Sequence, residues 1–268
     1  MKFLKKGIVV PDYKYRSLSS TQIHLPFPAR NVWIRLDQSA GSFAAPCVAA
    51  GDQVLTGTKI ADTNEWAGVP VHSSVSGFVR EVTDRYIMIQ SDESDRLDSS
   101  VHIRSQIPSD AVDLCNQIRA AGIVGPGAET LPTHVRLRKA REHGVRTLVL
   151  NGCESEPFLT ADHLLMLNHP VEILKGAELI RIASGAERVI IAVEKNKLEA
   201  IELLNSKNYN LKLKHIEMMA FPVRYPQGSE RVLIESVTGK KPIRGCDPLS
   251  SGVLVEHVAT ALDRKSVV

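Results

Sequence analysis

The sequence predicts an α/β protein in which a β-rich region at residues 1–105 precedes an α/β domain with a mainly parallel sheet at residues 106–268. Two observations lead to this prediction. Short apolar runs separated by turn residues fill the first region, and strand-like runs alternate with helical spacing after Pro108. Apolar residues make up 43% of the chain but aromatic residues only 5%, so aliphatic side chains must dominate the cores.

The β-rich region contains three runs that are typical of short strands, at residues 32–36, 78–82 and 86–89. Turn residues separate the runs, as at Gly51-Asp52 and Ser76-Gly77. A long helical period is not seen here, so this region is expected to consist of hairpins.

The region after Pro108 alternates between helical spacing and apolar runs. Buried strands are predicted at residues 147–150 and 188–193, and a further strand-like run spans about residues 215–220. Helices are predicted at residues 111–121, at 161–184 with a break near Pro170, and at 229–237. Asn196 with Glu199 resembles a capping box that opens a further helix.

Charge and hydropathy exclude several classes of protein. The net charge is +3 and Lys and Arg are dispersed, which argues against nucleic-acid binding. The sequence contains no apolar run of the roughly 18 residues that a membrane span needs. Basic residues in Met1–Lys6 are not followed by an apolar stretch, so a signal peptide is not predicted. We therefore expect a cytoplasmic protein, or one held at a membrane by partners.

The four cysteines are too far apart in sequence to predict a metal centre. They are Cys47, Cys115, Cys153 and Cys246. Zinc sites and iron–sulfur clusters usually draw two thiolates from one short loop, and these cysteines offer no such pair. The prediction is four reduced thiols, with no metal and no iron–sulfur cluster.

Two segments of the first region, Gly51–Gly57 and Pro70–Val79, resemble the paired hairpins of biotinyl/lipoyl-like domains, also called barrel-sandwich hybrids. In that fold Val54, Val71 and Val79 would fill a small β core. A carrier function would need an exposed lysine at a hairpin tip, but the loop at residues 62–68 has none. A structural or docking role is expected instead.

The first candidate ligand-binding motif is the loop Gly122–Arg136 with its glycines Gly125 and Gly127. A dinucleotide fingerprint should follow a strand and supply a third glycine. Here a helix is predicted before the loop and Thr130 takes the third place, so that fingerprint fails. A glycine-rich loop can still bring backbone amides to a phosphate. The alternative is a plain helix–loop joint.

Two further motifs follow predicted strands. Asn151–Pro157 comes directly after the strand at 147–150, where α/β sheets bind ligands, and its carboxylates, amide and hydroxyl could bond a polar ring and a ribityl chain. Its alternative is a polar loop that caps the next helix. Tyr225–Glu230 leads into a helix whose first amides favour an anion.

In this order the three motifs resemble the RnfC/RsxC-like component of the Rnf electron transport complex and, more remotely, the flavoprotein subunit of respiratory complex I. The resemblance begins at Gly7–Pro11 and ends at Gly252–Ala261, so it covers nearly the whole chain. It implies an N-terminal barrel-sandwich hybrid and an α/β domain that binds FMN and takes hydride from NADH.

The resemblance also implies roles for single residues, and none of them acts as a nucleophile or general base. Gly125, Gly127 and Arg136 would flank the FMN phosphate and ring. Asn151, Glu154 and Ser155 would hold the flavin, and Glu156 would face the nicotinamide. Tyr225, Gly228 and Glu230 would close the site. Electrons would pass to iron–sulfur clusters held by other subunits of a membrane complex, on the cytoplasmic face of the membrane.

Several positions depart from the family pattern. Pro126, Ala128, Glu129, Thr130 and Leu131 replace residues of its glycine-rich loop, and Ser229, His257 and Ala259 replace family residues elsewhere. Glu129 would place a negative charge near a phosphate, so we expect FMN binding that is weakened or lost. The alternative function is a flavin-less structural or assembly module. Relatives of this family continue into a β-grasp segment and a cluster-bearing module, which this sequence does not include.

Overall fold

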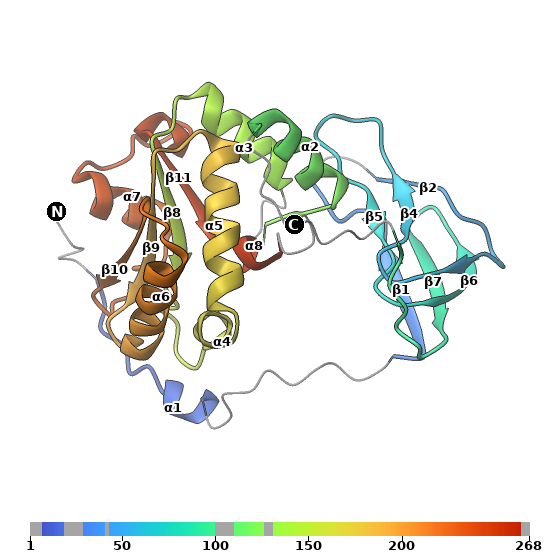
Figure 1. The fold of residues 1–268 in the computed structure, drawn as a ribbon, viewed down its shortest axis with the longest axis horizontal. Coiled ribbons are helices and arrows are strands. Elements are labelled where there is room, and N and C mark those ends of the chain that lie inside the picture. The colour runs from blue at the N-terminus through green and yellow to red at the C-terminus, as the bar shows by residue number, and fades with distance from the viewer. Residues whose placement is uncertain (1–6, 19–28, 41–42, 100–109, 126–130, 264–268) are drawn as a thin grey trace. The chain divides into compact units, whose positions relative to one another are not determined.

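The computed structural model describes residues 7–18, 29–40, 43–99, 110–125 and 131–263 (Figure 1). The described residues form two compact units. One unit, the β unit, comprises the described residues within 29–99 and 112–136, and the other, the α/β unit, comprises those within 7–18, 110–111 and 137–263. Each unit is described by itself below. The division of the chain at residues 105 and 106 stays a proposal.

The β unit contains two small antiparallel sheets, with strand orders β1-β7-β6-β3 and β2-β4-β5. The strands are β1 (Asn31–Arg35), β2 (Ala45–Pro46), β3 (Gln53–Val54), β4 (Lys59–Asp62), β5 (Val71–His72), β6 (Gly77–Val82) and β7 (Tyr86–Ser91). Val54, Val71 and Val79 lie in one buried aliphatic core together with Ile87 and Ile89. The antiparallel barrel-sandwich hybrid predicted for this region is therefore confirmed.

Gly77 begins β6 at a point where two backbones almost touch. A Cβ atom on Gly77 would lie 2.0 Å from the carbonyl oxygen of Gln90 on β7, and its φ is +157°. Only glycine fits such an approach. The predicted turn therefore lies at the residues just before Gly77, and Gly77 itself begins the strand.

Two helices of the chain, α2 (Ala111–Ala120) and α3 (Thr133–Glu142), follow the strands. Side chains from both hold the loop at residues 62–68, because Arg119 donates to the Thr63 carbonyl at 2.8 Å and His134 Nε2 lies 2.8 Å from the Trp66 carbonyl. The loop that would be the tip of a carrier arm is thus tied down. Lys59 forms an ion pair of 2.6 Å with Asp62 and is equally engaged.

The α/β unit is built on a four-stranded parallel sheet with the order β10-β9-β8-β11. Its strands are β8 (Thr147–Gly152), β9 (Arg188–Glu194), β10 (Ile216–Phe221) and β11 (Val253–His257). Its helices are α1 (Lys14–Ser17), α4 (Ala161–Asn168), α5 (Pro170–Ser184), α6 (Leu198–Leu211), α7 (Glu230–Thr238), α8 (Val258–Asp263) and the short 3-10 turn η1 (Pro248–Ser251). The strands predicted at 147–150, 188–193 and 215–220 are confirmed, as are the helices predicted at 161–184, after Asn196 and at 229–237. The elements α1, η1, β11 and α8 were not predicted.

The two faces of the parallel sheet carry different helices. Figure 1 shows α5 lying along one face, where it packs with α6 and α8. On the other face Leu233 and Ile234 of α7 pack against Val149, Ile190 and Phe221. Because both faces are covered, the inner parts of β8 and β9 are continuously apolar, as parallel strands usually are.

The close packing of α5 on α8 gives a first testable prediction. A Cβ on Gly176 would lie 1.9 Å from the carbonyl oxygen of Ala261. Alanine favours a helix over glycine by about 1 kcal/mol, but the two backbones would have to separate. We expect Gly176→Ala to lower the free energy of unfolding by about 3 kcal/mol, because overpacking outweighs propensity. Urea denaturation measures the change.

The control for Gly176→Ala is Gly239→Ala. Gly239 ends α7 with φ +74°, and no atom of the described chain lies within 4 Å of its hypothetical Cβ. Only backbone strain opposes this substitution, which should cost about 1 kcal/mol. A Gly176→Ala variant no less stable than Gly239→Ala would contradict the packing argument.

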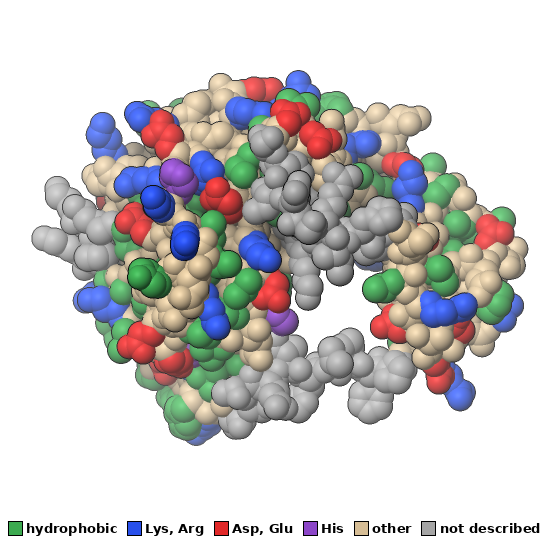
Figure 2. All heavy atoms as spheres, in the orientation of Figure 1, with side chains coloured by type: hydrophobic (Ala, Val, Ile, Leu, Met, Phe, Trp, Pro, Cys, Tyr) green, Lys and Arg blue, Asp and Glu red, His purple; other side chains and the backbone are tan. Residues whose placement is uncertain are grey.

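Lys, Arg, Asp and Glu side chains are interspersed on the face of the α/β unit drawn in Figure 2. The mixture fits the net charge of +3. Among the described residues no helix is both long and apolar enough to cross a bilayer.

Candidate functional site

The candidate site lies at the carboxyl edge of the parallel sheet, where ligands of α/β proteins usually bind. Register places Asn151 of β8 opposite His257 of β11 and Ala192 of β9. The loops that leave β8 and β9, and the loop before α7, therefore share one edge of the sheet. Two of the sequence motifs, Asn151–Pro157 and Tyr225–Glu230, lie on these loops.

Hydrogen bonds join the two motifs directly. Asn151 Nδ2 donates to the Gly228 carbonyl at 2.8 Å, and the Gly228 amide donates to Ser155 Oγ at 3.1 Å. Asn151 Oδ1 also accepts from the Cys153 amide at 3.0 Å. A Cβ on Gly228 would lie only 3.0 Å from the Cys153 carbonyl oxygen, so glycine permits this close approach. Three of the predicted site residues are thus brought together.

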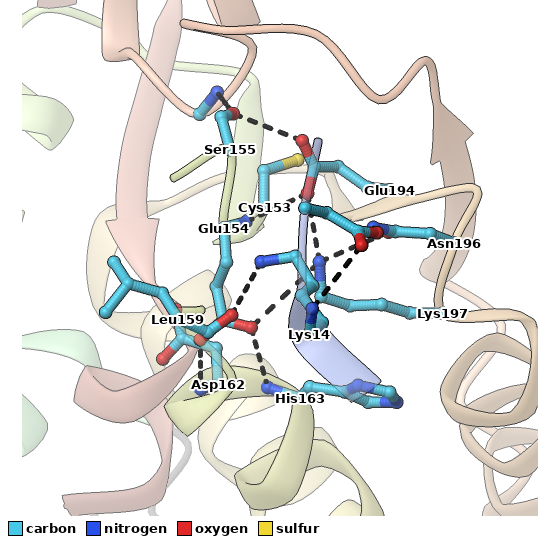
Figure 3. Close-up of polar contacts among 12 residues, drawn as sticks. Lys14, Cys153, Glu154, Ser155, Leu159, Asp162, His163, Glu194, Asn196 and Lys197 are labelled. Carbon is cyan, nitrogen blue, oxygen red and sulfur yellow. Dashed lines mark hydrogen bonds and ion pairs between the residues drawn. The ribbon is translucent and has the colours of Figure 1, made fainter. Parts of the chain in front are cut away.

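Behind these loops lies a buried cluster of two carboxylates and two lysines, Glu154, Glu194, Lys14 and Lys197 (Figure 3). None of the four is more than 5% exposed. Lys197 Nζ lies 2.9 Å from Glu194 Oε2 and 4.0 Å from Glu154 Oε2. Buried charges are tolerated when they are paired, and this cluster contains two of each sign. We call it the buried charge cluster.

Glu154 holds the start of helix α4. Its Oε1 accepts from the Asp162 amide at 2.7 Å, and its Oε2 accepts from the His163 amide at 3.3 Å. A carboxylate here satisfies free amides at the positive end of the helix dipole. Burial raises the pKa of Glu154 and the charge of Asp162 adds to this, while the Asp162 amide and Lys197 oppose it. This residue does cap the following helix.

Glu194, the last residue of β9, links the cluster to the loop after β8. Its Oε1 accepts from Ser155 Oγ at 3.1 Å, and its Oε2 accepts from the Glu154 amide at 3.2 Å. Its carboxylate also pairs with Lys197, as given above. One buried side chain therefore fixes the backbone of residues 154 and 155.

The remaining predicted site residues are more dispersed. Glu156 is exposed, Tyr225 is exposed at the beginning of its loop, and Glu230 is half-buried at the start of α7. Gly125 and Arg136, both half-buried, fall in the β unit, so they are described apart from the rest. Gly127 lies outside the described residues, as do Pro126, Ala128, Glu129 and Thr130.

Sequence reasoning found only one member of the buried charge cluster, Glu154. It did not point to Glu194, Lys197 or Lys14. The signal in the sequence was the polar run Glu194–Lys197, which holds three charged residues and begins at the last residue of the buried strand β9. The predicted capping box is wrong, since α6 begins at Leu198 without a side-chain cap from the described residues, and Asn196 donates to Asp12 Oδ2 at 3.0 Å instead.

His257 pairs with Asp162 at the same edge of the sheet. Its Nε2 lies 2.9 Å from Asp162 Oδ2, while the Ala259 amide makes a longer contact of 3.3 Å to its Nδ1. Burial disfavours the imidazolium, but the hydrogen bond and charge of Asp162 outweigh burial, and the pKa of His257 is raised above 6.5. The protonated form is therefore stabilised by folding.

This pair predicts a pH dependence of stability. A raised folded-state pKa gives stability that is fully present below the unfolded pKa of about 6.5 and is lost as pH rises through the folded pKa. The stability difference between wild type and His257→Asn should thus be larger at about pH 5.5 than at about pH 8.5. Urea denaturation at both values measures it, with His143→Asn, an exposed position, as control. A difference that grows with pH would contradict the assignment.

Two buried residues near the carboxyl edge of the sheet have side-chain polar groups without partners among the described residues. Gln227 is fully buried, and neither its amide nitrogen nor its oxygen has a hydrogen-bond partner there; the same holds for the hydroxyl of Thr260 at the start of α8. Buried polar groups without a partner are rare in proteins, so both side chains are candidates for bonding a ligand. Both residues lie on segments that leave the carboxyl ends of strands, β10 for Gln227 and β11 for Thr260. A neutral polar ring system with donors and acceptors fits this chemistry.

The described residues contain no group of three or more His, Cys, Asp or Glu side chains arranged to hold a metal ion. All four cysteines are free thiols, and Cys153 is buried, which raises the pKa of its thiol. The expectation that no iron–sulfur cluster forms stays a prediction.

Two family models match the chain. The Nuo51 FMN-binding domain matches residues 118–263, more than half of the chain, and the RnfC barrel sandwich hybrid domain matches residues 2–105. The chain belongs to the RnfC-like family. Its resemblance to the RnfC-type component of ion-translocating oxidoreductase complexes, predicted from the motifs, is confirmed.

Curated relatives of this RnfC-like chain are longer. It is 35% identical over 266 residues to the C subunit of the Na(+)-translocating ferredoxin:NAD(+) oxidoreductase complex of Acetobacterium woodii, covering 96% of this chain and 60% of that protein. It is 32% identical over 273 residues to the C subunit of the ion-translocating oxidoreductase complex of Erwinia tasmaniensis, covering 98% of this chain and 33% of that protein.

A solved structure shares the fold. An NAD+-reducing [NiFe]-hydrogenase in the air-oxidized state matches 59% of this chain and 30% of the hydrogenase chain, with a TM-score of 0.52 and 23% identity. At this identity the likeness concerns the fold alone.

Proposed function

We propose that this chain forms the FMN-binding part of the RnfC-type component of an ion-translocating complex, in which NADH passes hydride to FMN and electrons continue to iron–sulfur partners. The observation that supports it most is the junction of Asn151, Ser155 and Gly228 at the carboxyl edge of the sheet, within the region matched by the FMN-binding family. Partner subunits of the complex would hold the chain at the cytoplasmic face of the membrane.

In this proposal bound FMN supplies the two-electron acceptor, and the protein orients it. Asn151 and Ser155 act mainly by holding the loop of Gly228 in place, because their side-chain groups already bond within the chain. Gln227, which precedes Gly228 on this loop, has donor and acceptor capacity left unused by the described residues and would bond a polar ring if the loop exposed it.

The other predicted site residues keep the roles that the family resemblance implies. In this proposal Gly125, Gly127 and Arg136 flank the phosphate and ring of FMN. Glu156 faces the nicotinamide of NADH, and Tyr225 and Glu230 close the site. Of these, Glu156 is suited to contact a second, exchangeable ligand because it is exposed.

An absorbance spectrum of the purified protein tests the proposal. Flavin bands, FMN released on denaturation, and bleaching of the bands by NADH in a stopped-flow instrument are the expected results. Ferricyanide, a small acceptor, should then be reduced, whereas a bulky protein acceptor should need cluster-bearing partners. A protein that holds FMN but is never bleached by NADH would contradict the oxidoreductase function.

A mutation separates the NADH side from the flavin side. We expect Glu156→Gln to slow flavin bleaching by NADH about tenfold, a barrier increase of about 1.4 kcal/mol, with its FMN content unchanged. Stopped-flow absorbance and FMN content are measured on the same samples. Loss of flavin from the variant would place Glu156 among the FMN-binding residues instead.

A flavin-less assembly module is the second candidate, and one observation favours it. The side chains of Asn151, Glu154 and Ser155 are satisfied by intrachain bonds, so the motif is stable without a ligand. A colourless protein that does not take up added FMN yet still binds its sister subunits would support this candidate.

A further inference from the structure

The first described residues of the chain pack against the α/β unit and touch both loops of the candidate site. Ile8 and Tyr225 exchange a pair of backbone hydrogen bonds, of 3.0 Å from the Ile8 amide and 2.9 Å from the Tyr225 amide. Arg224 Nη1 also lies 3.5 Å from the Gly7 carbonyl. The loop that carries Tyr225 and Gly228 is therefore paired with a segment more than 200 residues away in sequence.

A second set of contacts joins residues 12–14 to the loop at 156–159. Lys14 Nζ donates to the carbonyl of Glu156 at 3.1 Å and to that of Leu159 at 2.6 Å, which are the two ends of this loop. The Phe158 amide donates to the Asp12 carbonyl at 2.8 Å. The Tyr13 and Phe158 rings stack with centroids 5.3 Å apart. Three consecutive residues thus hold a four-residue loop.

Both stacked residues have left-handed backbones. The φ of Tyr13 is +48° and that of Phe158 is +65°. For bulky side chains this conformation costs about 1–3 kcal/mol, and it persists only when surrounding contacts impose it. Phe158 is 47% exposed, so core packing does not impose it. The contacts with residues 12–14 are the described interactions that can.

Lys14 is suited to this task because it is only 5% exposed and both of its carbonyl partners lie on the loop. Burial and the charge of Lys197 lower the pKa of Lys14, while the charges of Glu154, Glu194 and Asp12 favour its ammonium form. An ammonium offers three donors in several directions, so it can bind two carbonyls and still face carboxylates. Removing it would release the loop and leave the buried charge cluster with an excess negative charge.

We propose that Lys14 is a positioning residue for the NADH side of the site. By fixing the Glu156 and Leu159 carbonyls it sets where the exposed Glu156 side chain lies, and so it controls affinity for the dinucleotide without touching the flavin. This inference rests on the proposed function. It adds that residues 7–14, far from the site motifs in sequence, are part of the binding site.

The test compares Lys14→Met with Lys175→Met, an exposed lysine on α5 that serves as control. Three quantities are measured on the full chain: FMN content, the KM for NADH with ferricyanide as acceptor, and hydrogen exchange of the peptide that contains residues 156–159. For Lys14→Met we expect unchanged FMN content, a KM about tenfold higher, and exchange about tenfold faster in that peptide, which corresponds to about 1.4 kcal/mol each. Lys175→Met should match wild type in all three.

Two further variants keep the test decisive. Adding propylamine to Lys14→Ala should restore the missing ammonium and lower the KM, an effect that a general loss of packing would not give. If near-ultraviolet circular dichroism shows that Lys14→Met does not fold, Phe158→Gly decides instead. Glycine accepts the left-handed backbone and removes the exposed ring, so it should raise the KM while FMN content stays constant.

The outcomes are distinguishable. Faster exchange with an unchanged KM, or no change in either, overturns the proposal for Lys14 while the proposed function stands. Loss of FMN from Lys14→Met also overturns it, since the effect would then lie on the flavin side. A wild-type protein that binds neither FMN nor NADH overturns the proposed function itself, and that result is seen before any variant is made.

Discussion

Replacing Lys197 with methionine is expected to lower the free energy of unfolding by about 3–5 kcal/mol, because removing one partner leaves a buried charge without compensation. Lys197 is fully buried and pairs with Glu194, which is also fully buried. Methionine has nearly the same length, so packing is kept while the charge is lost. Urea denaturation at neutral pH measures the change.

An exposed ion pair provides the control. Arg146 Nη2 lies 2.8 Å from Glu187 Oε2, but the two side chains are 75% and 61% exposed. Arg146→Met should cost less than about 1 kcal/mol, since solvent screens such pairs. The double variant Lys197→Met with Glu194→Gln should recover part of the loss. Similar costs for Lys197→Met and Arg146→Met would refute the view that the buried charge cluster depends on its balance.

The second prediction concerns the junction of the two site loops. Asn151→Ala removes the bond to the Gly228 carbonyl and the bond from the Cys153 amide. We expect a loss of about 2 kcal/mol, since both partners then lose a bond in a poorly hydrated place. If FMN is bound, its content on purification should fall as well, because the Gly228 loop is no longer fixed.

An isosteric variant separates the two bonds. Asn151→Asp keeps an acceptor for the Cys153 amide but sets an oxygen against the Gly228 carbonyl, so it should be about as costly as alanine. Asn168→Ala, at an exposed helix position, serves as control and should change stability by less than about 0.5 kcal/mol. Wild-type stability of Asn151→Asp would mean that the loop junction depends little on this side chain.

The elements that were predicted correctly are those with a continuous apolar run or with apolar residues at clear helical spacing. The runs at 147–150 and 188–193 became β8 and β9 because a sheet covered on both faces demands apolar residues throughout. Helix α3 was not predicted, since arginines and lysines interrupt its apolar positions. Strand β11 was noticed only through the family resemblance.

The candidate site could be predicted only in part. Motifs that follow strands located Asn151, Ser155 and Gly228, because the carboxyl edge of a sheet gathers successive loops. The buried lysines could not be found in this way. Lysine is rarely buried, and its burial here depends on partners distant in sequence, such as the Glu156 and Leu159 carbonyls that Lys14 binds across 142 and 145 residues. Asn196 is a second example of a contact that the sequence could not predict. We expected its side chain to cap the helix that follows it, but it donates a hydrogen bond to Asp12 instead.

The attachment of residues 7–18 to the α/β unit makes the β unit an insertion. The β unit occupies one nearly uninterrupted stretch of chain, whereas the α/β unit is assembled from two stretches on either side of it. During synthesis the β unit is therefore complete before the parallel sheet can form. Residues 7–18 can pack only after their partners in the α/β unit have been synthesised. A fragment that begins at residue 106 would lack Lys14 and Ile8, the β-bridge partner of Tyr225, so it would contain the sheet without the segment that holds both loops at its edge.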